Sequence, residues 1–138
     1  MSEENKAIVR KLMDQVWSGG NPAEVDELLS TEIVRREPGE EAPLRGLEEY
    51  KERVTFFRTA FPDLVVSFNE AVAEGNKVAV RWTASGTQKG ALGDVPASNR
   101  RFETSGCSIM RIENGRIVDE YATWDSLGFM QQLGAVPK

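Results

Sequence analysis

The spacing of apolar residues changes once along this chain, near Leu64, and that change constrains the fold more than any other feature. Before it, apolar residues recur at intervals of three and four, the period of a helix that buries one face. After it, runs rich in Val, Ile, Thr and aromatic residues are typical of β-strands. Helices followed by consecutive strands predict an α+β fold, with the helices packed on one face of a curved, mixed or antiparallel sheet.

Three helices are predicted before the change. The first covers roughly residues 3–18 and ends at Gly19 and Gly20. Asn21 and Pro22 begin a short second helix, because Asn is a favoured N-cap and Pro suits the first helical position. After an extended piece over residues 33–36, a third helix starts at about Leu47 and ends at Pro62. One face of this third helix carries Leu47, Tyr50, Val54, Phe57 and Phe61.

The remainder of the chain predicts a strand meander closed by a short helix. The expected strands cover residues 64–73, 77–87, 100–112 and 116–124. Asn114 and Gly115, between the last two strands, form the strongest short hairpin signal. A terminal helix is expected over residues 125–133, before Gly134. The chain carries no internal repeat or linker, so residues 1–138 are interpreted as one domain.

Composition narrows the possible chemistry. The chain has no histidine, which excludes Ser-His-Asp and Cys-His nucleophiles and His-ligated zinc. The single Cys107 can form neither an intrachain disulfide nor a thiolate-rich metal site, so no metal is expected. Seventeen basic against 22 acidic residues, a net charge of −5, argue against nucleic acid or an anionic membrane as partner. With neither a signal-peptide pattern nor a long apolar run, a cytoplasmic location is predicted.

Several local strings resemble the SnoaL-like branch of the NTF2-like superfamily, which includes polyketide cyclases. They are Val78-Ala79-Val80-Arg81-Trp82, Gly86-Thr87-Gln88-Lys89-Gly90, Met110-Arg111-Ile112 with Asn114-Gly115-Arg116-Ile117, and Trp124-Asp125-Ser126-Leu127-Gly128. The resemblance covers nearly the whole chain. It implies a cone-shaped α+β barrel, a homodimer, an apolar pocket for a small hydrophobic organic molecule, and no metal or organic cofactor.

The resemblance also shows which catalytic groups are missing. Cyclases of this branch close a ring by intramolecular aldol condensation, using an Asp as acid and base with a nearby His. The matching positions hold Ala122 and Ser108. Further positions at which relatives carry His hold Arg36, Gln88 and Glu120. The cyclase mechanism therefore cannot transfer unchanged, and any acid–base chemistry must come from a carboxylate.

Glu120 is the first candidate for that carboxylate. Strand alternation places it on one face with Val118, Ala122 and Trp124, and the resemblance turns this face toward the pocket. Burial among apolar side chains favours the neutral form of a carboxyl group, which suits a general acid or base. The alternative is that Glu120 pairs with an arginine such as Arg81 or Arg111 and only braces the sheet.

The other candidates also have structural alternatives. Asp125 is either a second catalytic carboxylate or the N-cap of the terminal helix, the preferred interpretation. Aromatic residues proposed to contact a ligand, or else to fill the core, are Trp17, Phe57, Trp82 and Trp124. Polar residues proposed to orient a carbonyl, enolate or carboxylate group are Arg36, Arg81, Gln88 and Ser108.

Two functions remain open at this point. The first is a cofactor-free enzyme of the cyclase, isomerase or lyase type, in which Glu120 acts as acid and base on a hydrophobic carbonyl compound. The second is a non-catalytic protein that binds or sequesters a small hydrophobic ligand. The replacement of both cyclase residues, by Ala122 and Ser108, supports the second alternative.

Overall fold

The computed structural model describes residues 2–138 and has helices at its N-terminal end followed by strands. The helices are α1 (Ser2–Lys11), the π-helix η1 (Leu12–Ser18), α2 (Ala23–Leu28), α3 (Gly46–Ala60) and α4 (Ser126–Gln132). The strands are β1 (Leu29–Arg36), β2 (Leu44–Arg45), β3 (Val65–Glu74), β4 (Lys77–Thr87), β5 (Arg101–Glu113) and β6 (Arg116–Trp124). The predicted α+β fold is confirmed. Within this described part, no helix is long and apolar enough to span a membrane.

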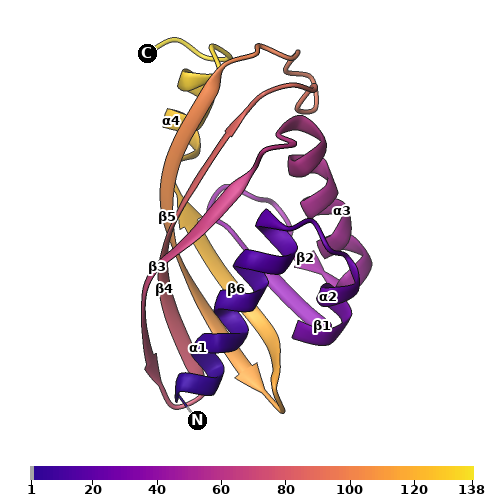
Figure 1. Ribbon diagram of the computed structural model, residues 1–138, viewed down its shortest axis with the longest axis vertical. Helices are drawn as coiled ribbons and strands as arrows, with labels where there is room; N and C mark the ends of the chain where they lie inside the picture. The colour runs from indigo at the N-terminus through magenta and orange to yellow at the C-terminus, as the bar shows by residue number, and fades with distance from the viewer. Residues whose placement is uncertain (1) are drawn as a thin grey trace.

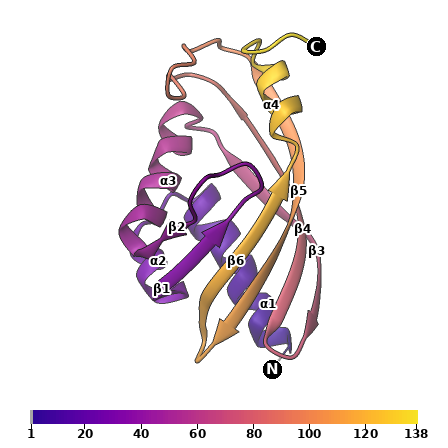
Figure 2. The ribbon, with the colours of Figure 1, turned by 180° about the vertical axis from the view of Figure 1, so that it is seen from behind.

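The six strands form one curved sheet in the order β2-β1-β6-β5-β4-β3. All neighbours are antiparallel except β1 and β6, which run parallel, so the sheet is mixed. Helices α1, α2 and α3 cover one face, and α4 lies beside the start of β5, close to the C-terminus (Figures 1 and 2). The described edge strands β2 and β3 do not pair with each other. The cone is therefore an open sheet around helices, not a closed barrel.

The first helix changes from α to π geometry at Leu12, which the apolar spacing did not predict. The π turn buries Leu12, Met13 and Val16 against the sheet. Arg58 of α3 binds the end of η1, donating hydrogen bonds to the carbonyls of Trp17 at 2.9 Å and Ser18 at 2.8 Å. Helix ends leave carbonyls without internal partners, so this guanidinium both satisfies them and fixes the position of Trp17.

A β-bulge in β6 decides which side chains of this strand face inward. Arg111 of β5 pairs with Asp119, whereas the next residue, Ile112, pairs with Ile117, so Val118 is an extra residue. Ile117 and Glu120 are both buried, while Val118 lines a separate surface groove with Asp119. The prediction that Val118 shares a face with Glu120 is therefore wrong, because the bulge resets the alternation.

Gly106 of β5 allows two tryptophans to approach the same strand closely. It pairs with Trp82 of β4 on one side and Trp124 of β6 on the other. A Cβ atom at this position would lie 2.6 Å from Trp82 Cζ2 and 2.7 Å from Trp124 Cβ. It would also lie 2.6 Å from the Thr123 carbonyl oxygen, and no ordinary contact is this short, so any larger side chain must displace the Trp82 indole or the β6 backbone.

Gly106→Ala is expected to lower the free energy of unfolding by about 1–3 kcal/mol, the usual cost of overpacking a close contact. The measurement is urea unfolding followed by far-UV circular dichroism. Cys107→Ala, at the next and exposed position, is the control and is expected to change stability by less than about 0.5 kcal/mol. Wild-type stability in Gly106→Ala would show that the two indoles do not need this space.

Candidate active site

A cavity of about 80 Å³ lies between the helices and the buried face of the sheet. Much of its wall is aromatic, and the aromatic lining residues are Trp17, Phe57, Trp82, Phe102, Trp124 and Phe129. Aliphatic residues and methionines complete the apolar part of the wall, and the polar lining residues are Arg35, Glu37, Arg53, Thr104, Ser108 and Glu120. An apolar space with a small number of convergent polar groups is the usual form of a site for a small organic molecule.

The aromatic walls come from separate elements that pack edge to face. Phe129 of α4 lies against Trp124 of β6, with 5.2 Å between ring centroids, and against Phe102 of β5 at 4.8 Å. Trp17 of η1 donates its indole N–H to the Tyr50 hydroxyl at 3.0 Å, which ties η1 to α3. Such pairs add stability beyond their buried area, so the walls are held in place by one another.

Glu120 and Arg35 form the polar centre of the cavity. They are register partners on the parallel strands β6 and β1, and their exposed fractions are only 5% and 6%. Arg35 Nε lies 3.3 Å from Glu120 Oε1, close enough for an ion pair, but the geometry is not that of a hydrogen bond. Both atoms are buried, and neither has a hydrogen-bond partner among residues 2–138; buried polar atoms in this state call for an explanation.

Burial and nearby charges shift the pKa values of Arg35 and of Tyr50, which lies beside the pair. Burial by itself lowers the pKa of the Arg35 guanidinium, but the charges of Glu120 and Glu37 outweigh it and hold that pKa above its usual value. Burial raises the pKa of the Tyr50 hydroxyl well above its usual value, and the charge of Glu120 raises it further. Arg35 therefore stays cationic, and Tyr50 stays a neutral hydroxyl beside the pair.

Ser108 supplies a hydrogen-bond donor to the cavity because of its contact with Trp82. The indole N–H of Trp82 donates to Ser108 Oγ at 3.0 Å, and both side chains are buried. An indole can only donate, so Ser108 must accept, and its own O–H is available to donate to a bound molecule. Ser108 is also the register partner of Ala122, so the two positions that correspond to the cyclase His and Asp lie side by side.

Ser108→Ala is expected to lower the free energy of unfolding by about 1–3 kcal/mol, because it leaves the buried Trp82 N–H without an acceptor. Urea titration measures the change. Ser105→Ala makes the same chemical change at an exposed position of the same strand and is expected to be close to neutral. Equal losses in the two variants would contradict the assigned hydrogen bond.

The structure brings only some of the predicted site residues together. Those that line the cavity are Glu120, Trp17, Phe57, Trp82, Ser108 and Trp124. Arg81 does not, since it is exposed on the opposite face of the sheet and its Nε donates to Glu70 Oε1 at 2.8 Å. Arg36 is also exposed, because strand alternation turns it away from the buried face on which its neighbour Arg35 lies.

Gln88 and Asp125 have structural partners outside the cavity. Gln88 is fully buried, and its side chain binds the loop that follows β4, accepting from the Ser98 hydroxyl at 2.6 Å and donating to the Val95 carbonyl at 3.4 Å. Asp125 is exposed and is the N-cap of α4, with Oδ1 accepting the Gly128 N–H at 2.9 Å. Neither side chain lines the cavity.

Sequence reasoning missed Arg35, Glu37 and Arg53, which line the cavity. For Arg35 a signal was present, since it lies two residues after the buried Ile33 on one strand and must share its face. Glu37 follows the end of β1, and Arg53 lies on α3 among other charged residues. Nothing in their spacing distinguishes these two from solvated charges.

The fold, helices on one face of an open mixed sheet with a cavity between them, is that of the NTF2-like proteins. The chain belongs to the SnoaL-like polyketide cyclase family, whose model matches residues 7–133. Membership supports a role as a small-molecule enzyme of the cyclase or isomerase type.

Individual relatives agree with this assignment. The aklanonic acid methyl ester cyclase DnrD of Streptomyces peucetius is 30% identical over 129 residues, covering 92% of this chain and 88% of DnrD. Among solved structures, TsrD of Streptomyces laurentii has a TM-score of 0.87 at 29% identity, covering 99% of this chain and 98% of TsrD. IdmH of Streptomyces antibioticus has a TM-score of 0.82 at 27% identity, covering 94% and 98%.

Proposed function

We propose that this protein closes a ring in a hydrophobic carbonyl compound by carboxylate acid–base catalysis, with Glu120 as the acid and base. The observation that carries the proposal is the buried pair at the polar end of the cavity. Glu120 Oε1 and Arg35 Nε lie 3.3 Å apart in an otherwise largely apolar space, and each lacks a hydrogen-bond partner. A bound carbonyl oxygen would accept from Arg35 Nε, and Glu120 Oε1 would then face the acidic C–H group beside that carbonyl.

The proposed reaction is an intramolecular aldol closure that uses the chain's own groups. Glu120 takes a proton from the carbon next to one carbonyl, and Arg35 and the Ser108 hydroxyl stabilise the enolate oxygen. The enolate carbon then bonds to a second carbonyl carbon, whose oxygen becomes an alkoxide. Glu120 returns its proton to that alkoxide. One C–C bond forms, one C=O π bond breaks and one proton moves, so the product has the mass of the substrate.

The position of Glu120 explains how a cyclase could work without the family's Asp. Glu120 lies two residues before Ala122 on the same buried face of β6, a displacement of roughly 7 Å along the strand. It is therefore one inward-facing position away from the place the resemblance assigns to the acid–base Asp. In the proposed reaction the base therefore lies at a different position on β6, and the reacting carbon of the substrate is displaced by a similar distance.

A non-catalytic binding protein is the second candidate, and one observation favours it. Glu120 already has Arg35 as its counter-charge, as expected for a residue that only braces the sheet.

The size of the cavity bears on both functions. Its volume of about 80 Å³ is smaller than the roughly 150 Å³ space that holds benzene in an engineered apolar cavity. Aromatic walls must therefore move apart to admit a ring, under either function.

One assay separates the two functions. The compound in the name of the relative DnrD, aklanonic acid methyl ester, is incubated with the protein, and products are analysed by liquid chromatography with mass spectrometry. Catalysis predicts a new species of unchanged mass. A raised melting temperature without product would favour the binding protein, since binding alone stabilises by mass action. No product and no thermal shift would contradict both for this substrate class.

We also propose that the sheet face opposite the helices forms a homodimer, as the family resemblance implies. Ile109 of β5 and Tyr121 of β6 are register partners on this face, and their exposed fractions are 51% and 49%. Large exposed apolar side chains that adjoin one another favour association. Sedimentation analysis is expected to give twice the 15.3 kDa chain mass, and a monomer at all concentrations would contradict the proposal.

A further inference from the structure

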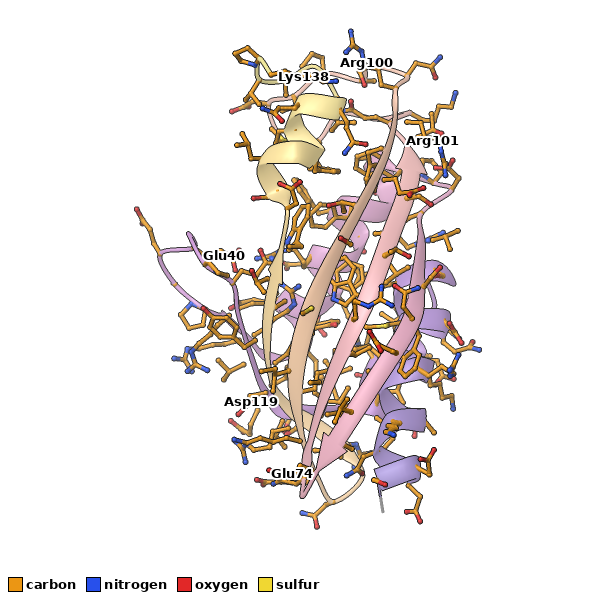
Figure 3. All side chains as sticks on the ribbon, turned by 90° about the vertical axis from the view of Figure 1, so that its left-hand side faces the viewer. Glu40, Glu74, Arg100, Arg101, Asp119 and Lys138 are labelled. Atoms are coloured by element: carbon orange, nitrogen blue, oxygen red, sulfur yellow. The ribbon has the colours of Figure 1, made fainter. Side chains whose placement is uncertain are left out.

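The polar end of the cavity carries charges that alternate in sign across three elements. Arg35 of β1 lies between Glu120 of β6 and Glu37, whose Oε1 accepts from Arg35 Nη1 at 2.5 Å. Arg53 of α3 then approaches the same Glu37 oxygen at 3.9 Å and binds Glu40 at 2.8 Å. Glu40 lies on the loop that projects from the end of β1 (Figure 3).

Glu37 occupies the place on Arg35 that a ligand carboxylate would take. A guanidinium presents several donors in a plane and binds carboxylates readily, so a buried arginine in a cavity is normally an anion receptor. Here one side of Arg35 faces Glu120 and another donates to Glu37. The Glu37 side chain lines the cavity and is only 16% exposed. One side of the Arg35 guanidinium is therefore already occupied by the chain's own carboxylate, while Nε has no hydrogen-bond partner among the described residues.

The charge balance at this end of the cavity disfavours an anion. Among the described residues that line the cavity, the two arginines are Arg35 and Arg53, and both are paired with glutamates. With Glu40 included, three carboxylates face two guanidinium groups. A ligand carboxylate would enter beside Glu37 and Glu120, and like charges placed this close in a buried site repel strongly.

We infer that Glu37 is a specificity-determining residue that excludes anionic ligands and restricts the cavity to neutral carbonyl compounds, such as an ester in preference to its free acid. The inference rests on the cavity being the substrate site of the proposed function. Specificity of this kind comes from a repulsive group that disfavours the wrong ligand. Glu37 supplies that group, and it also neutralises the cation that would otherwise attract the wrong ligand.

The test uses methyl benzoate and benzoate, which share a ring and differ in charge at neutral pH. Binding is followed by tryptophan fluorescence, because Trp17, Trp82 and Trp124 line the cavity. The wild-type protein is expected to bind methyl benzoate at least about tenfold more tightly than benzoate. Glu37→Gln keeps an amide oxygen that can accept from Arg35 but removes the charge. It is expected to strengthen benzoate binding about tenfold and to change methyl benzoate binding less than about twofold.

Glu70→Gln is the matched control, because Glu70 pairs with Arg81 on the opposite face of the sheet. It removes the same charge far from the cavity and is expected to leave the preference for the ester unchanged. Far-UV circular dichroism verifies folding of each variant. Should Glu37→Gln fail to fold, Glu37→Ala carries the same comparison, because it removes the same charge, and the same gain for benzoate alone is expected.

Three results would overturn the inference. These are equal wild-type affinity for the two ligands, an equal gain for both in Glu37→Gln, or no binding of either ligand to either protein. The experiment measures binding alone, so it is independent of whether Glu120 catalyses a reaction. Charge selectivity without turnover would contradict the proposed function but not the role of Glu37. Turnover without charge selectivity would contradict the role of Glu37 but not the proposed function.

Discussion

Arg35→Met is expected to lower the free energy of unfolding by about 3–5 kcal/mol, because it leaves the Glu120 carboxylate buried without its counter-charge. Methionine keeps a long unbranched stem, so little packing is lost with the guanidinium. The same change removes the donor to Glu37, which is more exposed and so contributes less to the loss. Urea unfolding at neutral pH, followed by circular dichroism, measures the effect.

A double variant distinguishes loss of the charge pair from simple damage to the site. Arg35→Met combined with Glu120→Leu replaces both buried charges with apolar groups, and such replacements are often close to neutral. The double variant is therefore expected to be more stable than Arg35→Met alone. The coupling between the two sites should exceed about 1 kcal/mol, as it does for residues in direct contact. Additive losses would contradict the ion pair as the reason for the instability.

Glu120→Gln is expected to reduce turnover of the proposed substrate, aklanonic acid methyl ester, by roughly two to four decades, the usual contribution of a general base. Glutamine keeps the size of the side chain and an oxygen that can face Arg35, but it cannot accept the substrate proton. The Michaelis constant is expected to change little, because the aromatic residues that line the cavity are unaltered. Steady-state kinetics on the purified variant measure both quantities.

Asp125→Asn is the matched control for this variant, since it makes the same carboxylate-to-amide change outside the cavity. Asparagine is as good an N-cap as aspartate, so helix α4 should keep its first turn. Turnover should therefore equal that of the wild-type protein. A large loss of turnover in Asp125→Asn, with full activity in Glu120→Gln, would reverse the assignment of the catalytic carboxylate and reduce Glu120 to an ion-pair partner.

The fold could be predicted because its signal is repeated along whole elements. The change of period near Leu64 and the turn at Asn114-Gly115 specify helices followed by an antiparallel meander, and β4 and β6 have the predicted bounds. The two-residue strand β2 is too short to show alternation. The π-helix changes the number of residues per turn, and the bulge at Val118 adds one residue to β6. Neither leaves a signature in the kinds of residue present, so apolar spacing alone does not reveal them.

The site could be predicted only where alternation on a strand decides which side chains face inward. Trp82 and Arg81 are adjacent on β4, so only one of them can face the cavity, and Trp82 does. The resemblance points to Arg36, where relatives carry His, but alternation along β1 turns Arg36 outward and its neighbour Arg35 toward the cavity. Glu37 reaches the cavity through tertiary contacts that no local spacing encodes.

Proton abstraction by Glu120 is the central step of the proposed reaction, and hydrogen–deuterium exchange in aklanonic acid methyl ester tests it most directly. The ester is incubated with protein in deuterium oxide, and deuterium at the carbon next to the carbonyl is measured in recovered substrate by mass spectrometry. The wild-type protein is expected to accelerate exchange, and Glu120→Gln to slow it by roughly two to four decades. Equal exchange in the two proteins would contradict the assignment of Glu120 as the base.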